Sequence, residues 1–91
     1  MKKSTENATV DYEPEKITDS VEIRFFKTVS GDRCSVHGKI TKDGAEAGSV
    51  TYDSRNGLYI VSLKPVSSLT SEEQGAVLAG VHGCVSEILA D

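Results

Sequence analysis

The stretch VEIRFFKTVSGDRCSVHGKIT, residues 21–41, decides the fold of this chain. Its apolar residues recur at every second position in two runs, and the turn-forming pair Gly31–Asp32 lies between the runs. Because side chains alternate between the two faces of a β-strand, this pattern predicts two half-buried strands joined by a tight hairpin. A two-residue turn places Ile23 opposite Ile40, so both runs contribute to one apolar face.

Two further runs of strand-forming residues follow, and turn-forming residues separate each run from the one before it. We therefore predict an antiparallel meander of four strands, in which each strand pairs with the next one along the chain. The predicted strands span residues 20–29, 33–41, 46–54 and 58–64.

The loop between the second and third strands sets which side chains share a face. A three-residue loop at 42–44 that ends in a glycine bulge places Val36 opposite Val50. The same register places Gly38 opposite Gly48, which leaves a shallow depression on the inner face of the sheet.

The facing of the apolar residues also decides between turn lengths. A two-residue turn at Asp43–Gly44 would turn the apolar side of the second strand away from the core, so we prefer the three-residue loop. Between the third and fourth strands, a two-residue turn at Asn56–Gly57 places Tyr52 opposite Val61 on the inner face.

A helix is predicted at residues 71–89, where apolar residues recur with helical spacing. Thr70 and Glu73 have the spacing of a capping box at its start. The predicted apolar stripe consists of Val77, Leu78, Val81, Cys84, Val85, Ile88 and Leu89. Because this stripe matches the apolar face of the sheet, the predicted fold class is α+β: a four-stranded antiparallel meander with one C-terminal helix packed on one face.

Residues 1–19 are polar and show neither helical nor strand periodicity. We therefore expect this segment to be a disordered, flexible polar tail. The alternative is that its apolar residues Val10, Tyr12 and Ile17 dock onto the domain or onto a partner. Residues 20–91 then form a single α+β domain. A chain of this length is small for a domain that is stabilised by one hydrophobic core.

Lys27 interrupts the apolar side of the first predicted strand. In a four-stranded meander the first strand is an edge, and an inward-facing charge on an edge strand hinders pairing with other sheets. We therefore expect Lys27 to protect this edge, unless a bulge turns its side chain outward.

Three glycines, Gly75, Gly80 and Gly83, lie within the predicted helix, although each costs roughly 1 kcal/mol relative to alanine. On a helical wheel, four small residues lie on the side away from the apolar stripe: Ala76, Ala79, Gly80 and Gly83. Either this face is simply solvated, or these residues form a contact strip where a partner helix or a second copy approaches closely.

The outer face of the predicted sheet carries an aromatic side chain among basic ones. The predicted hairpin places Phe26 opposite His37 and Arg24 opposite Lys39. An aromatic ring with basic neighbours on an open sheet is one way of binding single-stranded nucleic acid. The same residues are also compatible with a protein-contact surface or with an ordinary polar sheet face.

Composition and spacing argue against several functional classes. The formal net charge of −4 disfavours strong nonspecific binding to nucleic acid, and no apolar run has the ~20 residues that a membrane span needs. Cys34, His37, His82 and Cys84 are zinc-ligand types, but each pair points to different sides of its element, so we predict no metal and no cofactor. We find no spacing typical of a nucleophile and its base, and we predict no enzyme activity.

These observations favour a small, soluble, cytoplasmic protein whose role is a non-catalytic protein interaction. The expected partner is another protein or a weakly bound second copy. Weak binding of nucleic acid through the outer sheet face remains the alternative.

Overall fold

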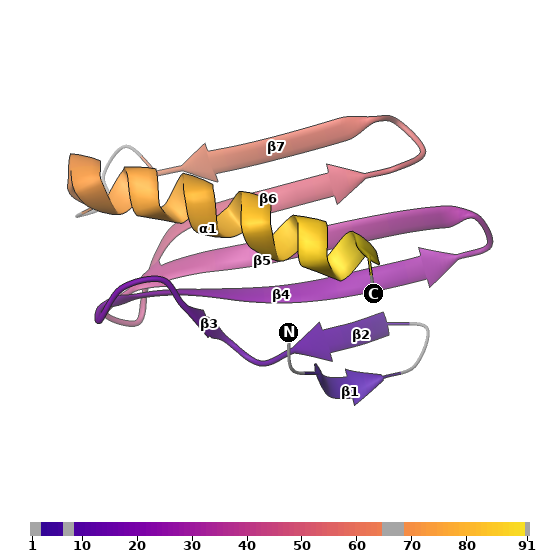
Figure 1. The fold of residues 1–91 in the computed structure, drawn as a ribbon, viewed down its shortest axis with the longest axis horizontal. Coiled ribbons are helices and arrows are strands. Elements are labelled where there is room, and N and C mark those ends of the chain that lie inside the picture. Colours follow the sequence, from indigo (N-terminus) through magenta and orange to yellow (C-terminus); the bar gives the residue numbers. More distant parts are fainter. Residues whose placement is uncertain (1–2, 7–8, 65–68, 91) are drawn as a thin grey trace.

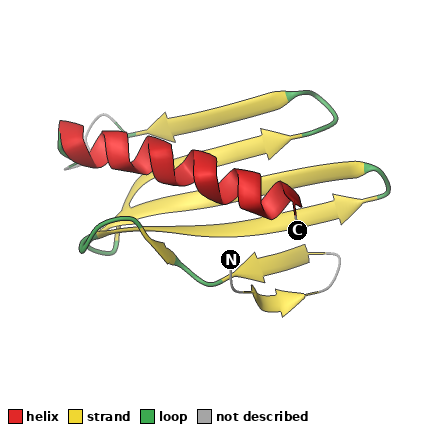
Figure 2. Cartoon of the chain, in the orientation of Figure 1, coloured by secondary structure: helices red, strands yellow, loops and turns green. Residues whose placement is uncertain are grey.

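The computed structural model describes residues 3–6, 9–64 and 69–90, and these form one antiparallel sheet with one helix across it (Figures 1 and 2). The elements are β1 (Lys3–Glu6), β2 (Thr9–Tyr12), β3 (Glu15–Lys16), β4 (Val21–Ser30), β5 (Arg33–Lys42), β6 (Ala45–Asp53), β7 (Leu58–Leu63) and α1 (Ser71–Ala90). The strand order is β1-β2-β4-β5-β6-β7, and β3 also pairs with β4. The predicted α+β class is therefore confirmed, but four strands are too few.

The prediction of a disordered tail at residues 1–19 is wrong for the described part of that segment. β2 and β3 both pair with β4, and β1 pairs with β2. The side chains of Val10 and Tyr12 lie in the core, and Tyr12 is only 1% exposed. Burial of these two apolar side chains offsets the entropy lost when a polar segment is ordered.

The β4–β5 hairpin has the predicted register. Ile23 pairs with Ile40, Val29 pairs with Cys34, and the turn lies between Ser30 and Arg33. Gly31 has a φ of +62°, a conformation that glycine adopts without steric cost.

The predicted register of the β5–β6 hairpin is wrong. Gly38 pairs with Val50, and Gly48 pairs with Ile40, so the two glycines are not opposite each other. The turn is the two-residue Asp43–Gly44, whose positive φ angles of 51° and 81° are those of a type I′ turn.

A β-bulge explains why this shorter turn still buries the correct face. Thr41 pairs with Glu46 and Ile40 pairs with Gly48, so Ala47 is an extra residue in β6. Ala47 and Gly48 are both buried, which breaks the alternation of β6 and returns Val50 to the inner face. The bulge therefore does what the predicted longer loop was expected to do.

The loop between β6 and β7 is also longer than predicted. Asp53 pairs with Leu58, and four residues connect them instead of the expected Asn56–Gly57 pair. The Asp53 carboxylate accepts hydrogen bonds from the Arg55 N–H at 3.0 Å and the Asn56 side-chain amide at 3.3 Å. These bonds stabilise the wider loop, and the register shifts by two residues, which keeps the predicted face of β7.

Helix α1 begins with the predicted capping box. Thr70 N–H donates to the Glu73 carboxylate at 3.0 Å, and Glu73 N–H donates to the Thr70 hydroxyl at 3.1 Å. Four residues of the predicted stripe are buried: Val77, Val81, Val85 and Ile88. Leu78 and Leu89 instead lie outside the contact with the sheet, with exposed fractions of 50% and 40%.

Lys27 faces inward, as predicted, but β4 is not an edge of the sheet because β2 and β3 cover it. The Lys27 ammonium donates a hydrogen bond to the Ile88 carbonyl at 3.1 Å. The last turn of α1 contains no basic residue of its own, so Lys27 supplies a positive charge at the negative end of the helix dipole. Its role is to anchor the helix and not to protect an edge.

Candidate interaction surfaces

The outer face of the sheet brings together the four residues predicted there. Phe26 and His37 pair across β4 and β5, and their rings stack with centroids 5.2 Å apart and an interplanar angle of 24°. Arg24 pairs with Lys39 immediately beside them, and both side chains are exposed. The Phe26 side chain is 39% exposed, so the stacked pair presents an accessible aromatic surface beside two positive charges.

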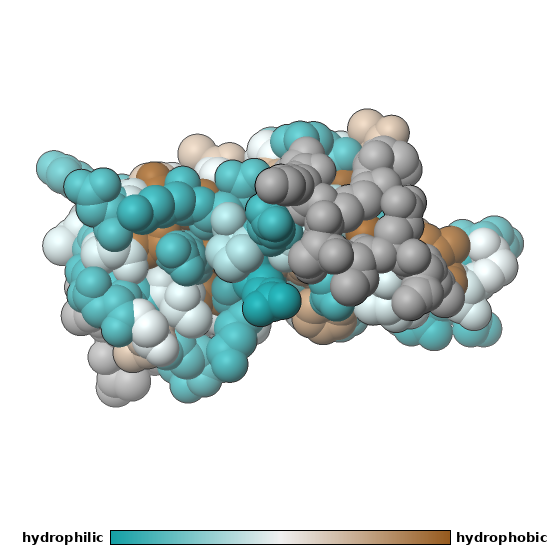
Figure 3. Space-filling view, turned by 90° about the horizontal axis from the view of Figure 1, so that it is seen from below, coloured by the Kyte–Doolittle hydropathy of each residue, from teal (hydrophilic) through white to brown (hydrophobic). Residues whose placement is uncertain are grey.

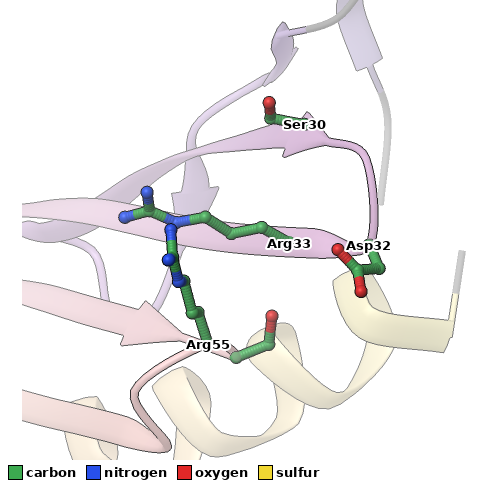
Figure 4. Close-up of a pocket in the computed structure, with 5 residues that line it drawn as sticks. Ser30, Asp32, Arg33 and Arg55 are labelled. Carbon is green, nitrogen blue, oxygen red and sulfur yellow. The ribbon is translucent and has the colours of Figure 1, made fainter.

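A polar depression continues from His37 towards the end of the hairpin. The part nearest the stack has a volume of about 240 Å³, and it is lined by Thr28, Ser30, Arg33, Ser35 and His37. A second depression of about 680 Å³ is lined by Ser30, Asp32, Arg33, Ser54 and Arg55 (Figure 4). Sequence patterns did not indicate it, because two loops distant in the chain meet only when β5 lies beside β6.

Positive and negative charges are mixed in this depression. Arg33 donates to the Asp53 carboxylate at 3.0 Å, and the Arg55 side chain points towards the Arg33 guanidinium (Figure 4). Burial raises the pKa of Asp53, but hydrogen bonds from the Arg55 N–H and from Arg33 outweigh it and leave the pKa below its usual value. Asp53 and Asp32 therefore oppose the two guanidinium groups, which weakens the attraction of this depression for anions.

The four residues of the predicted contact strip on α1 have different surroundings. Ala79 and Gly83 are exposed, whereas Ala76 and Gly80 are half-buried. A Cβ built on Gly80 would lie 2.5 Å from the terminal methyl carbon of Ile17, so the N-terminal segment packs on the helix at this position. The missing side chain of Gly80 thus leaves room for Ile17 of the same chain, and the contact strip is not one continuous exposed surface.

An ion pair joins the start of α1 to the sheet. Lys42 donates to the Glu73 carboxylate at 2.6 Å, and the Ser20 hydroxyl donates to its other oxygen at 3.3 Å. Hydrogen bonds from Lys42 and from the Thr70 N–H lower the pKa of Glu73 to about 2, although partial burial opposes them. This cluster is fully occupied by contacts within the chain, so it stabilises the fold.

Strand β7 is an edge of the sheet, and no strand in the described ranges pairs with its outer side. Its sequence LYIVSL contains no charged residue. Leu58, Tyr59 and Ile60 are 41%, 43% and 48% exposed, and they lie on alternating faces of the strand. The opposite edge differs in sequence, because β1 reads KSTE. The coloured residues on the side seen in Figure 3 are mostly hydrophilic, and apolar atoms show between them.

The cysteines and the acidic groups do not converge on one site within the described segments. Cys34 and Cys84 are free and half-buried, and burial raises the pKa of the Cys84 thiol, with further contributions from Glu15 and Glu87. No cluster of three His, Cys, Asp or Glu side chains suited to a metal occurs among the described residues. The one helix of that part of the chain is not apolar enough to cross a membrane.

Comparisons with protein-family models, curated proteins and solved structures found no match to this chain.

Proposed function

We propose that this protein is a non-catalytic interaction module that binds another polypeptide through the β7 edge of its sheet. The observation that carries the proposal is the exposure of Leu58, Tyr59 and Ile60 on a strand whose outer side has no pairing partner among the described strands. Exposed apolar edge strands form intermolecular sheets readily, and folded proteins usually protect them.

The absence of charge on β7 supports this proposal. Lys27, the inward charge that was expected to protect an edge, lies on the interior strand β4 and bonds to the carbonyl of Ile88. No charge interrupts β7, so nothing in its own sequence hinders the approach of another strand. Binding through an edge also explains why the surface depressions of the described chain are open and polar, since such a module needs no enclosed pocket.

The helix contact strip contributes less to this proposal than the sequence suggested. Ile17 covers Gly80, which leaves Ala79 and Gly83 as its exposed members. The free thiols of Cys34 and Cys84 fit a reducing compartment, and we propose on that basis that the protein works in the cytoplasm.

The test compares two baits that differ at one exposed position. Ile60→Lys places a charge on the outer face of β7, and Leu78→Lys places one on an equally exposed position of α1. We expect a partner, once purified, to bind the wild type and Leu78→Lys equally and to bind Ile60→Lys at least about tenfold more weakly. Equal binding to all three proteins would show that β7 is not the contact.

A second function, weak binding of single-stranded nucleic acid, is favoured by the Phe26–His37 stack. A base can stack on the exposed Phe26 ring, while Arg24 and Lys39, which are paired on one side of the stack, approach a neighbouring phosphate. The net charge of −4 and the acidic groups of the neighbouring depression oppose this binding, so we rank it second.

A further inference from the structure

The backbone of β7 has hydrogen-bonding groups directed away from the sheet. Lys64 N–H donates to the Ala47 carbonyl at 2.9 Å, so Lys64 points its backbone groups at β6. These directions alternate along an antiparallel strand. The N–H and C=O groups of Tyr59, Val61 and Leu63 are therefore directed outward, where no described strand accepts them.

These outward groups define the shape of the partner. Three residues spaced two apart present donors and acceptors in the geometry of a sheet ladder, which an extended backbone can pair with at all three positions. The side chains that flank this ladder are apolar on both faces, so the partner strand must also be apolar on both faces to bury them.

A second copy of β7 meets this requirement by symmetry. In an antiparallel pair centred on Val61, the ladder residues Tyr59 and Leu63 of one copy lie opposite Leu63 and Tyr59 of the other. On the outer face, Ile60 lies opposite Ser62 of the second copy. In this register, each residue of β7 lies opposite a residue of the same face in the second copy. The inner faces of the two sheets therefore lie on the same side of the joined sheet, and both helices lie on that side.

The absence of charge matters most in a symmetric contact. A two-fold axis brings each residue near its own copy, so any charge at the centre of β7 would face a like charge. The six residues of β7 contain none, whereas the exposed side of α1 has Glu72 and Glu87 among its residues. A symmetric contact is therefore less hindered at β7 than at the helix.

We propose that β7 pairs antiparallel with β7 of a second copy, which joins the two sheets into one continuous sheet. This inference rests on the proposed function and names the partner. The contact is formed by backbone hydrogen bonds from Tyr59, Val61 and Leu63, and by the apolar side chains of both faces.

Sedimentation equilibrium of the purified full chain over a range of concentrations tests the pairing. We expect the wild type to be a dimer that dissociates on dilution, and Val61→Pro to remain a monomer. Proline removes an N–H that points away from β6, so the fold of the monomer is retained. Ile60→Lys, which keeps the backbone intact, should raise the dissociation constant at least about tenfold, and Leu78→Lys should leave it unchanged.

A cysteine at position 61 tests the register. In a background with both native cysteines replaced, Val61→Cys should form a disulfide-linked dimer under mild oxidation, because paired residues have Cα atoms about 5.5 Å apart. Leu58→Cys should not, because the two copies of residue 58 lie at opposite ends of the paired strands. Cross-linking of Leu58→Cys but not Val61→Cys would overturn the register.

The outcomes separate this inference from the proposed function. A wild type that is monomeric at every concentration overturns pairing with a second copy. If Ile60→Lys nevertheless loses a purified partner that Leu78→Lys retains, then β7 binds a different protein and the proposed function stands. A dimer that Val61→Pro and Ile60→Lys do not weaken uses another surface, and it also overturns the inference.

Discussion

Gly80 of α1 and Ile17 of the N-terminal segment are in direct contact, and a Cβ on Gly80 would lie 2.5 Å from the Ile17 terminal methyl carbon. No other atom outside the helix comes as close to this position. In contrast, a Cβ on Gly75 or Gly83 would meet nothing within 4 Å. The glycines of this helix therefore have different physical roles, which a helical wheel alone does not distinguish.

The first prediction concerns the stability of alanine variants. Gly83→Ala should increase the free energy of unfolding by up to about 1 kcal/mol, because alanine is the better helix former and the site is open. Gly80→Ala should gain less, or be destabilising, because its methyl group must displace Ile17. Urea unfolding measures both variants.

A double variant provides the control for this comparison. In the Ile17→Ala background the obstructing methyl is absent, so Gly80→Ala should then stabilise about as much as Gly83→Ala. Equal effects of the two glycine substitutions in the wild-type background would show that Ile17 does not pack there.

The second prediction concerns acid stability. Because the pKa of Glu73 is lowered from 4.5 to about 2, its carboxylate stabilises the folded state above pH 4.5, and this contribution is lost as the pH falls towards 2. Glu73→Gln retains the capping oxygen but not the charge paired with Lys42. Its unfolding free energy should therefore fall less steeply over this pH range than that of the wild type. Parallel pH profiles would contradict the ion pair.

The third prediction concerns the anchor at the end of α1. Lys27→Met removes the ammonium that donates to the Ile88 carbonyl, and it keeps a side chain of similar length. We expect a loss of about 1 to 2 kcal/mol of stability. Hydrogen exchange should show the last turn of the helix opening more than the first. An unchanged exchange pattern would mean that water replaces the lysine at no cost.

The fourth prediction tests the outer sheet face. Short single-stranded oligonucleotides at low salt should shift the amide resonances of Arg24, Phe26, His37 and Lys39 if this face binds bases. Phe26→Ala should weaken such binding by about 1–3 kcal/mol, whereas Leu78→Ala should not. If no resonance shifts at any oligonucleotide concentration, the nucleic-acid alternative is wrong.

The central hairpin and the helix could be predicted because their signals are local. The turn between Ser30 and Arg33 and the alternation around it determine the β4–β5 register, and Thr70 with Glu73 marks the start of the helix. These signals depend on residues close in sequence, so no tertiary information is needed.

The N-terminal strands could not be predicted, because their burial depends on distant partners. Val10 and Tyr12 are two apolar residues in a polar segment, and they are buried in a core cluster made with residues of later strands and of α1. The predicted length of the loop before β7 was wrong because it too depends on a contact that the local pattern does not show. Asn56–Gly57 resembles a two-residue turn, but the carboxylate of Asp53 forms hydrogen bonds that a turn of that length does not provide.

Among the candidate surfaces too, those set by residues close in sequence could be predicted, and those that depend on distant residues could not. The Phe26–His37 pair follows directly from the hairpin register. The free edge at β7 also follows, because the last strand of the predicted meander has no later strand to pair with. The depression around Arg33 and Arg55 could not be located from local patterns, because it joins two loops that are distant in the sequence.

Ala47 gives strand β6 one residue more than its neighbour can pair with. Deleting a residue within a strand normally reverses every side chain beyond it. Deleting Ala47 would instead leave Thr41 opposite Glu46 and Ile40 opposite Gly48, as they are now. A frame-preserving loss of this codon should therefore be tolerated, at the expense of one buried methyl group. At this bulge, the β5–β6 hairpin can therefore lose one residue without moving the side chains of the inner face to the outer face.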